Sequence, residues 1–161
     1  RDMGTTIVAA LLHGGQVHLA HIGDSRIYLY RDGAIGCLTQ DHSLANDPSM
    51  GEVPWLSAEE KRRRLGHILT RCLGVGTERK VDIPLSTVTL HPGDRFLLCT
   101  DGLSDLVEDE EIAATLAAEA NPLVACRALI DQANQCGGKD NVSVALLDIQ
   151  EVSQAGASNE G

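Results

Sequence analysis

Short apolar runs separated by turn residues dominate the first forty residues. The runs are rich in β-branched and aliphatic side chains, which is typical of strands. Gly14-Gly15 and Asp32-Gly33 each separate two runs, and Gly-Gly and Asp-Gly pairs favour hairpin turns. This part of the chain therefore predicts an antiparallel meander of four strands: Thr5 to Leu12, Gln16 to Ile22, Ile27 to Arg31 and Ala34 to Leu38.

The remaining runs predict four more strands and three helices. Two helices precede the final strand, which predicts an α+β fold with antiparallel sheet. Ser57 and Glu60 form a capping box that starts a short charged helix, and Asn121-Pro122 starts another helix as its cap and first residue. The predicted strands are Ile68 to Leu73, Val81 to Leu90, Phe96 to Thr100 and Val142 to Ile149, and the helices are 57–65, 108–120 and 122–136.

The composition narrows the class of protein. A length of 161 residues with 43% hydrophobic residues is typical of one globular domain. The net charge of −10 and an aromatic content of 2% argue against nucleic acid, which needs basic patches and stacking rings. No run of about 18 apolar residues occurs, so no membrane segment is expected. The five cysteines have no zinc-ligand spacing, so we expect free thiols, with Cys99 and Cys126 in buried elements, in a reducing cytoplasm.

The short charged helix contains the run Lys61-Arg62-Arg63-Arg64 and few apolar residues. We expect it on the surface, because it offers no apolar stripe to a core. Its basic run is interpreted as a solvated face, with the alternative that it holds an anionic partner. Trp55, the only tryptophan, is expected to pin this segment to the body of the protein.

Three aspartates lie next to glycine or close to it at the ends of predicted strands: Asp24, Asp101 and Asp140. An Asp-Gly pair by itself usually marks only a turn. Their shared placement, however, predicts that they meet over one pocket and bind a hard divalent cation, Mg²⁺ or Mn²⁺, through oxygen ligands. Several carboxylates without a side-chain nucleophile favour hydrolysis by a water held between two metal ions.

Other catalytic arrangements are poorly supported by the sequence. There is no Gly-x-Ser-x-Gly elbow and no phosphate-binding Gly-x-x-x-x-Gly-Lys loop. The six histidines are scattered; His18 and His21 lie in a predicted strand and are interpreted as structural, whereas His42 lies in a loop that could adjoin a site.

Six motifs in one order resemble the metal-dependent protein Ser/Thr phosphatases of the PP2C (PPM) family, bacterial branch. The resemblance extends over nearly the whole chain to Ile149. The motifs are Met3-Gly4-Thr5-Thr6, Gly23-Asp24-Ser25-Arg26, Leu38-Thr39-Gln40-Asp41-His42-Ser43, Leu69-Thr70-Arg71-Cys72-Leu73-Gly74, Leu98-Cys99-Thr100-Asp101-Gly102-Leu103 and Gly137-Gly138-Lys139-Asp140-Asn141-Val142.

The resemblance implies an antiparallel β-sandwich flanked by helices, with two core metal ions at one end. It implies that Asp101 and Asp140 bind the core ions and that Asp24, together with Asp101, holds a weaker third ion. It further implies hydrolysis of phosphoserine and phosphothreonine in proteins that a Ser/Thr kinase has modified, by a monomer without nucleic-acid or membrane partners. Residues 1–150 would then be the C-terminal part of the phosphatase domain, with a variable flap over about 46–66, and residues 151–161 a flexible tail.

One family feature is not found in this chain. Family members carry an Asp-Gly-x-Gly-Gly turn, whose aspartate bridges both core metals, upstream of the Met-Gly-Thr-Thr motif, whereas this chain begins at Arg1. We therefore expect a piece of a longer phosphatase that exposes a sheet edge and apolar surface. The alternative function is a catalytically incomplete module that binds phosphoproteins or kinase partners.

Overall fold

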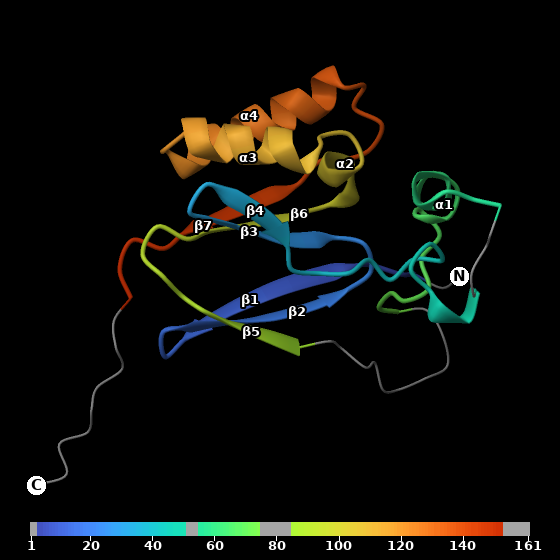
Figure 1. Ribbon diagram of the computed structural model, residues 1–161, viewed down its shortest axis with the longest axis horizontal. Helices are drawn as coiled ribbons and strands as arrows, with labels where there is room; N and C mark the ends of the chain where they lie inside the picture. Colours follow the sequence, from blue (N-terminus) through green and yellow to red (C-terminus); the bar gives the residue numbers. More distant parts are fainter. Residues whose placement is uncertain (1–2, 51–54, 75–84, 153–161) are drawn as a thin grey trace, which may run out of the picture.

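The computed structural model describes residues 3–50, 55–74 and 85–152, in which seven strands form two antiparallel sheets that face each other (Figure 1). The first sheet has the order β1-β2-β5, and the second has the order β4-β3-β6-β7. The strands are β1 Ile7–His13, β2 Gln16–Ile22, β3 Arg26–Arg31, β4 Ala34–Cys37, β5 Leu85–Thr89, β6 Arg95–Cys99 and β7 Val144–Asp148.

Helices cover the second sheet on the side away from the first (Figure 1). Three of them follow β6 in the chain and precede β7, and α1 stands apart at the end of the sheets where α2 begins. The helices are α1 Ala58–Leu65, α2 Asp101–Ser104, α3 Asp109–Ala118 and α4 Pro122–Gln135, with a short 3₁₀ turn, η1, at Pro48–Met50. The expected α+β fold, a β-sandwich flanked by helices, is confirmed.

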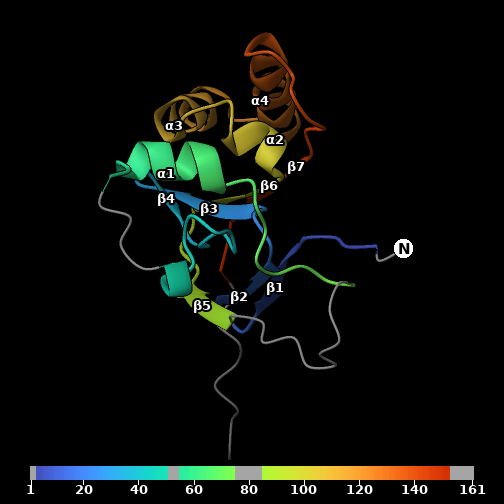
Figure 2. The same ribbon diagram turned by 90° about the vertical axis from the view of Figure 1, so that its right-hand side faces the viewer.

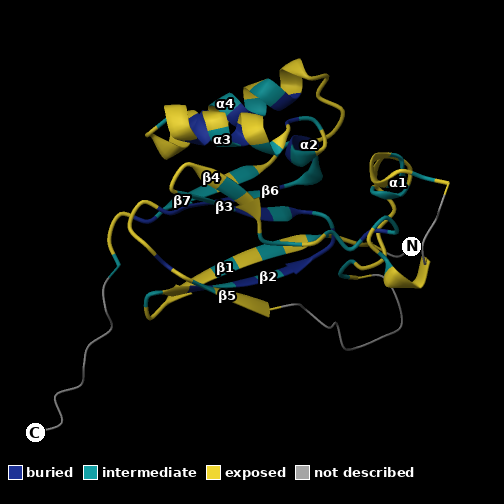
Figure 3. Ribbon diagram, in the orientation of Figure 1, coloured by how far each residue is buried: buried dark blue, intermediate teal, exposed yellow. Residues whose placement is uncertain are grey.

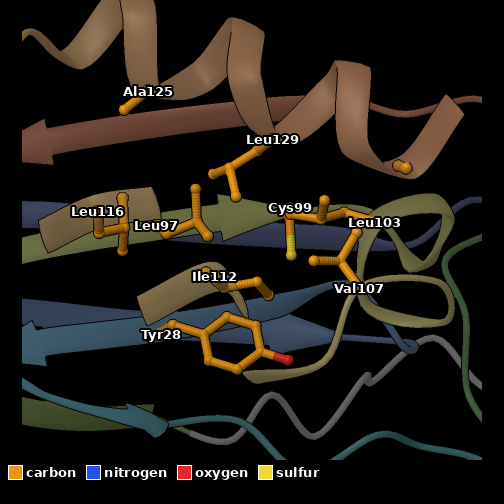
Figure 4. Packing of buried hydrophobic residues seen from close by; sticks show 10 residues of the cluster. Tyr28, Leu97, Cys99, Leu103, Val107, Ile112, Leu116, Ala125 and Leu129 are labelled. Carbon is orange, nitrogen blue, oxygen red and sulfur yellow. The ribbon is translucent and has the colours of Figure 1, made fainter. Parts of the chain in front are cut away.

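The second sheet contributes to two separate hydrophobic cores. Successive side chains of a strand point to opposite faces, so in β6 Phe96 faces the first sheet and Leu97 faces the helices. In β3, Ile27 and Tyr28 divide in the same way. Within this sheet β6 is the most buried strand, whereas β4 is largely exposed (Figure 3). The helix-side core is shown in Figure 4.

Both predicted hairpins are present, but the predicted meander is wrong. Strand β1 pairs with β2 through Gly14-Gly15, and β3 pairs with β4 through Asp32-Gly33. The residues at both turns have positive φ, as this kind of turn requires. β2 and β3 do not pair with each other, because β2 takes β5 as its second partner and β3 takes β6. The break at Gly23 thus moves the chain from one sheet to the other.

Three smaller predictions need correction. Trp55 is 79% exposed and pins nothing. The predicted strand 68–73 consists only of two isolated bridges, Thr5↔Leu73 and Ser43↔Leu69. In α4 the buried residues are Ala125, Leu129 and Ala133, whereas Cys126, expected in a buried element, is only partly buried.

Other predictions agree with the structure or fall outside it. All five cysteines are free, and burial raises the pKa of the Cys99 thiol to about 12, which keeps it protonated and inert. Residues 81–84 of one predicted strand and residues 153–161 of the predicted tail lie outside the described residues. Within the described residues, no helix is long and apolar enough to cross a membrane.

The three-stranded sheet leaves apolar side chains in solvent. Ile7 and Leu11 of β1 are 44% and 66% exposed, and Leu85 of β5 is 79% exposed. The expected exposure of apolar surface is therefore confirmed for this sheet.

Candidate metal site

A pocket of about 430 Å³ lies where β6 ends and β3 begins. Figure 2 looks onto this end of the sheets, with α1 on the near side. All three aspartates predicted from the sequence line the pocket: Asp24, Asp101 and Asp140. They come from a β2–β3 turn, the start of α2 and the loop before β7, so residues 116 positions apart in the chain converge.

Asp101 is the first residue of α2 and is held at the end of the buried strand β6. Its Oδ1 accepts a hydrogen bond of 2.9 Å from the Gly102 N–H. Burial, together with the negative charges of Asp105 and Asp140, raises the pKa of Asp101 above its usual value. A carboxylate that is destabilised in this way gains more from a bound cation than a solvated one does.

The loop that carries Asp140 packs directly against Asp101. Thr100 Oγ1 donates to the Asn141 carbonyl at 3.1 Å, and the Ser143 N–H donates to Thr100 Oγ1 at 3.0 Å. A Cβ at Gly102 would lie 2.4 Å from the Asn141 carbonyl oxygen, so only glycine permits this approach. Glycine at 102 thus brings the two carboxylates to one pocket.

Asp24 sits on the turn that leads the chain from one sheet to the other. Gly23 has φ of 103°, and a Cβ there would lie 2.3 Å from the side chain of Thr6. Thr6 Oγ1 in turn shares a hydrogen bond of 2.9 Å with Ser25 Oγ. Burial and the charge of Asp101 raise the pKa of Asp24, which indicates that the two carboxylates affect each other across the pocket.

Hydrogen bonds attach the turn that carries Asp24 to residues 39–43, a segment that we call the strap. Arg26 binds both oxygens of Asp41 at 2.9 and 2.7 Å, and its Nη1 donates to the Tyr28 hydroxyl. The Gly23 N–H donates to His42 Nδ1, which requires that this nitrogen carry no proton. His42 stacks on His21 and burial lowers its pKa, so it is a neutral structural histidine in the strap rather than a group at the metal site.

Positive side chains also line the pocket. Arg62 and Arg63 come from this helix, and Lys139 from the turn before Asp140. The described residues contain three ion pairs, and none of them includes Arg62, Arg63 or Lys139. We call Asp24, Asp101 and Asp140 the acidic wall of the pocket, and Arg62 and Arg63 of α1 its basic wall.

The chemical type of their donor atoms suits the three aspartates to a divalent cation. Their donors are carboxylate oxygens, which Mg²⁺ and Mn²⁺ prefer, and two of the three lie partly buried with raised pKa values. Among the described residues, however, no three His, Cys, Asp or Glu side chains lie close enough together to form a ready metal site. The aspartates thus fit as part of a coordination shell that other oxygen donors complete.

Sequence reasoning missed several residues of the pocket. Asp105, the C-terminal cap of α2, lies four residues after Asp101, one helical turn further on; this spacing was a readable signal. Asp41 and Arg26 were visible as motif residues, but no sequence pattern showed that they pair. Glu108, the N-terminal cap of α3, also lines the pocket without any sequence signal for that position.

The described residues thus form an antiparallel β-sandwich with helices on one face and an aspartate-lined pocket at the end of its strands. Residues 1–135 match the family described as protein phosphatase 2C. The chain belongs to this family.

Known relatives agree with this assignment. The chain is 37% identical to the serine/threonine phosphatase stp of Listeria monocytogenes over 155 residues, which cover 96% of this chain and 60% of the relative. The structure of the S. agalactiae serine/threonine phosphatase matches with a TM-score of 0.82 at 35% identity, over 92% of this chain and 60% of that one. The catalytic domain of the phosphatase PstP, solved in complex with two manganese ions, matches with a TM-score of 0.77 at 37% identity, over 92% and 60%.

The chain spans about three fifths of the length of the Listeria relatives that it matches. What the relatives do therefore enters only as support for a proposal about the whole protein.

Proposed function

We propose that the intact protein removes phosphate from phosphoserine and phosphothreonine side chains of proteins, with two divalent metal ions as cofactors. One observation carries the proposal: Asp24, Asp101 and Asp140, which are far apart in the sequence, line one pocket. Membership of the protein phosphatase 2C family and the two manganese ions in the PstP structure support it.

Asp101 and Asp140 are proposed as ligands of the core metal ions, and Asp24, with Asp101, as a ligand of a weaker third ion. Bound there, Mn²⁺ or Mg²⁺ would lower the pKa of a water molecule and neutralise the phosphoryl oxygens. No side chain of the chain is proposed as the nucleophile.

The residues of the chain position these ligands. Two hydrogen bonds join Thr100 Oγ1 to the loop after Asp140, and they hold the Asp101 and Asp140 carboxylates at a fixed spacing. The Arg26–Asp41 pair holds the turn that carries Asp24. The mutual repulsion of Asp24 and Asp101 is the cost of this arrangement, and a cation relieves it.

The substrates are proposed to be phosphoproteins that a Ser/Thr kinase has modified, and the site of action the cytoplasm. The protein is expected to act as a monomer, without nucleic acid or membrane. The family membership supports the substrate class, and the acidic composition with its net charge of −10 is unfavourable for a polyanionic partner.

The test is phosphate release by the intact protein from a phosphothreonine peptide and from nitrophenyl phosphate, with Mn²⁺ and after its removal by EDTA. We expect turnover that requires the metal and that Asp101→Asn lowers at least about 1,000-fold, because metal catalysis supplies several kcal/mol. Turnover that persists in EDTA contradicts the proposal. Binding of the phosphopeptide without any turnover at saturating Mn²⁺ would instead favour the non-catalytic module.

A further inference from the structure

The basic wall of the pocket is formed mainly by one helix that contributes nothing to the core. α1 has no buried residue, yet Arg62 and Arg63 line the same pocket as Asp24 and Asp101. Arg64, the next residue on the same helix, does not line it. A helix turn is 3.6 residues, so α1 presents one side of its basic run to the carboxylates and another to solvent.

The position of α1 relative to the aspartates is set by backbone hydrogen bonds at its base. The His42 N–H donates to the Gly23 carbonyl at 2.9 Å, beside Asp24. The chain returning from α1 joins the same strap, since the Thr70 N–H donates to the His42 carbonyl at 2.8 Å. Leu44 bonds to Ile68 in the same way, at 2.8 Å. The two ends of the α1 segment are thus attached to the turn that carries Asp24.

Glu59 of α1 competes only weakly with an anion for Arg62 and Arg63. Glu59 also lines the pocket and lies three and four residues before Arg62 and Arg63. Helical pairs at this spacing gain little from each other, and no ion pair within 4.0 Å joins them in the structure. Both guanidinium groups remain available to an anion that enters the pocket.

The phosphoryl group of a substrate belongs at the aspartates, where the cations would bind, so α1 would meet the residues beside it. A guanidinium group binds a carboxylate through two parallel hydrogen bonds and repels an ammonium group. We propose that Arg62 and Arg63 select substrates in which acidic side chains flank the phosphorylated residue. This inference rests on the proposed phosphatase function.

The test compares phosphothreonine peptides that differ only in having Glu or Lys on both sides of the phosphorylated residue. The intact protein with Mn²⁺ should show a kcat/KM about tenfold higher for the Glu peptide. This ratio should fall to about twofold or less in the double variant Arg62→Gln, Arg63→Gln, mainly through KM. Because each ratio is taken within one variant, a general loss of activity cancels. Added salt should shrink the ratio in the parent protein.

Arg64→Gln removes the same charge from the same helix outside the pocket, and it should keep both the ratio and the turnover of nitrophenyl phosphate. Equal rates on the two peptides, a preference that survives in the double variant, or an equal loss in Arg64→Gln each overturn the inference. The proposed function stands in those cases if nitrophenyl phosphate is still hydrolysed. Absence of turnover on every substrate overturns both.

Discussion

The acidic and basic walls of the pocket are built in opposite ways. The acidic wall stands on β6, the most buried strand of the second sheet, and Gly102 and Thr100 lock it to the Asp140 loop. The basic wall stands on α1, which has no fully buried residue and whose flanking segments are attached to the Asp24 turn by backbone hydrogen bonds. The proposed metal ligands therefore have the rigid support that precise placement requires, whereas the arginines proposed to recognise the substrate stand on a surface helix.

The Arg26–Asp41 pair connects the Asp24 turn to the segment that leads to α1, and a substitution of Arg26 removes it. Arg26→Met leaves the Asp41 carboxylate without its partner in a mostly buried position, and we expect a loss of about 3 kcal/mol in the free energy of unfolding. Chemical denaturation measures the loss, and hydrogen exchange should show faster opening around α1.

Arg31→Met is the matched control for Arg26→Met. It breaks another bidentate pair, with Asp94 at 2.6 and 2.7 Å, at the other end of β3. A comparable loss of stability without faster exchange around α1 is expected. Faster exchange around α1 in both variants would show that global destabilisation, not the strap, controls this helix.

The acidic wall itself can be broken at Gly102. Gly102→Ala places a Cβ 2.4 Å from the Asn141 carbonyl oxygen, and backbone must move to relieve the clash. We expect a loss of about 1–3 kcal/mol and weaker binding of Mn²⁺, measured by denaturation and by calorimetry. Gly36→Ala, with open space around the new Cβ, should change neither quantity. If Gly102→Ala is as harmless as Gly36→Ala, the contact with Asn141 does not position the site.

Loss of its N-terminal cap should destabilise α1 without affecting the rest of the protein. Ser57→Ala removes the cap whose Oγ accepts the Glu60 N–H, which should weaken α1 by about 1 kcal/mol. Hydrogen exchange over residues 58–65 should quicken while the midpoint of global unfolding stays nearly constant, since α1 buries no side chain. Asn121→Ala, the same kind of change at the cap of α4, should lower the global midpoint, because α4 packs in the core.

The smallest effect concerns the charge of Asp101. Its pKa is raised in the folded protein, so the folded state binds a proton more tightly than the unfolded state, and stability falls as pH rises through the window that begins near the unfolded value of 3.8. Asp101→Asn removes this cost. Without metal we expect the variant to be more stable at pH 7 by less than about 1 kcal/mol, because the side chain is only partly buried.

The difference in stability between Asp101→Asn and the parent should disappear below about pH 4, where the Asp101 carboxyl is protonated in both the folded and the unfolded state. Saturating Mn²⁺ should reverse the order at pH 7, because only the parent gains from the bound ion. Thermal melting across the pH range measures each of these differences. A variant less stable than its parent at pH 7 without metal would contradict the raised pKa.

Local signals in the sequence determined most elements and the candidate site residues. Glycine pairs at turns, the capping box at Ser57 and the cap at Asn121 act over a few residues, so their physics is visible in the chain itself. The three aspartates were found in the same way, from carboxylates at the ends of apolar runs. The ordered motifs then allowed the family to be identified.

Tertiary structure alone decided which strands pair and which charges meet. Four strands in a row could have formed one meander. They form two hairpins in two sheets because β2 pairs with β5 and β3 with β6, both far along the chain, and the two sheets bury apolar side chains between them. Nothing near Arg26 in the chain identifies Asp41 as its partner, and nothing in the basic run shows which arginines face the pocket. Such contacts depend on packing between distant segments, whose free energy appears only when the whole core has formed.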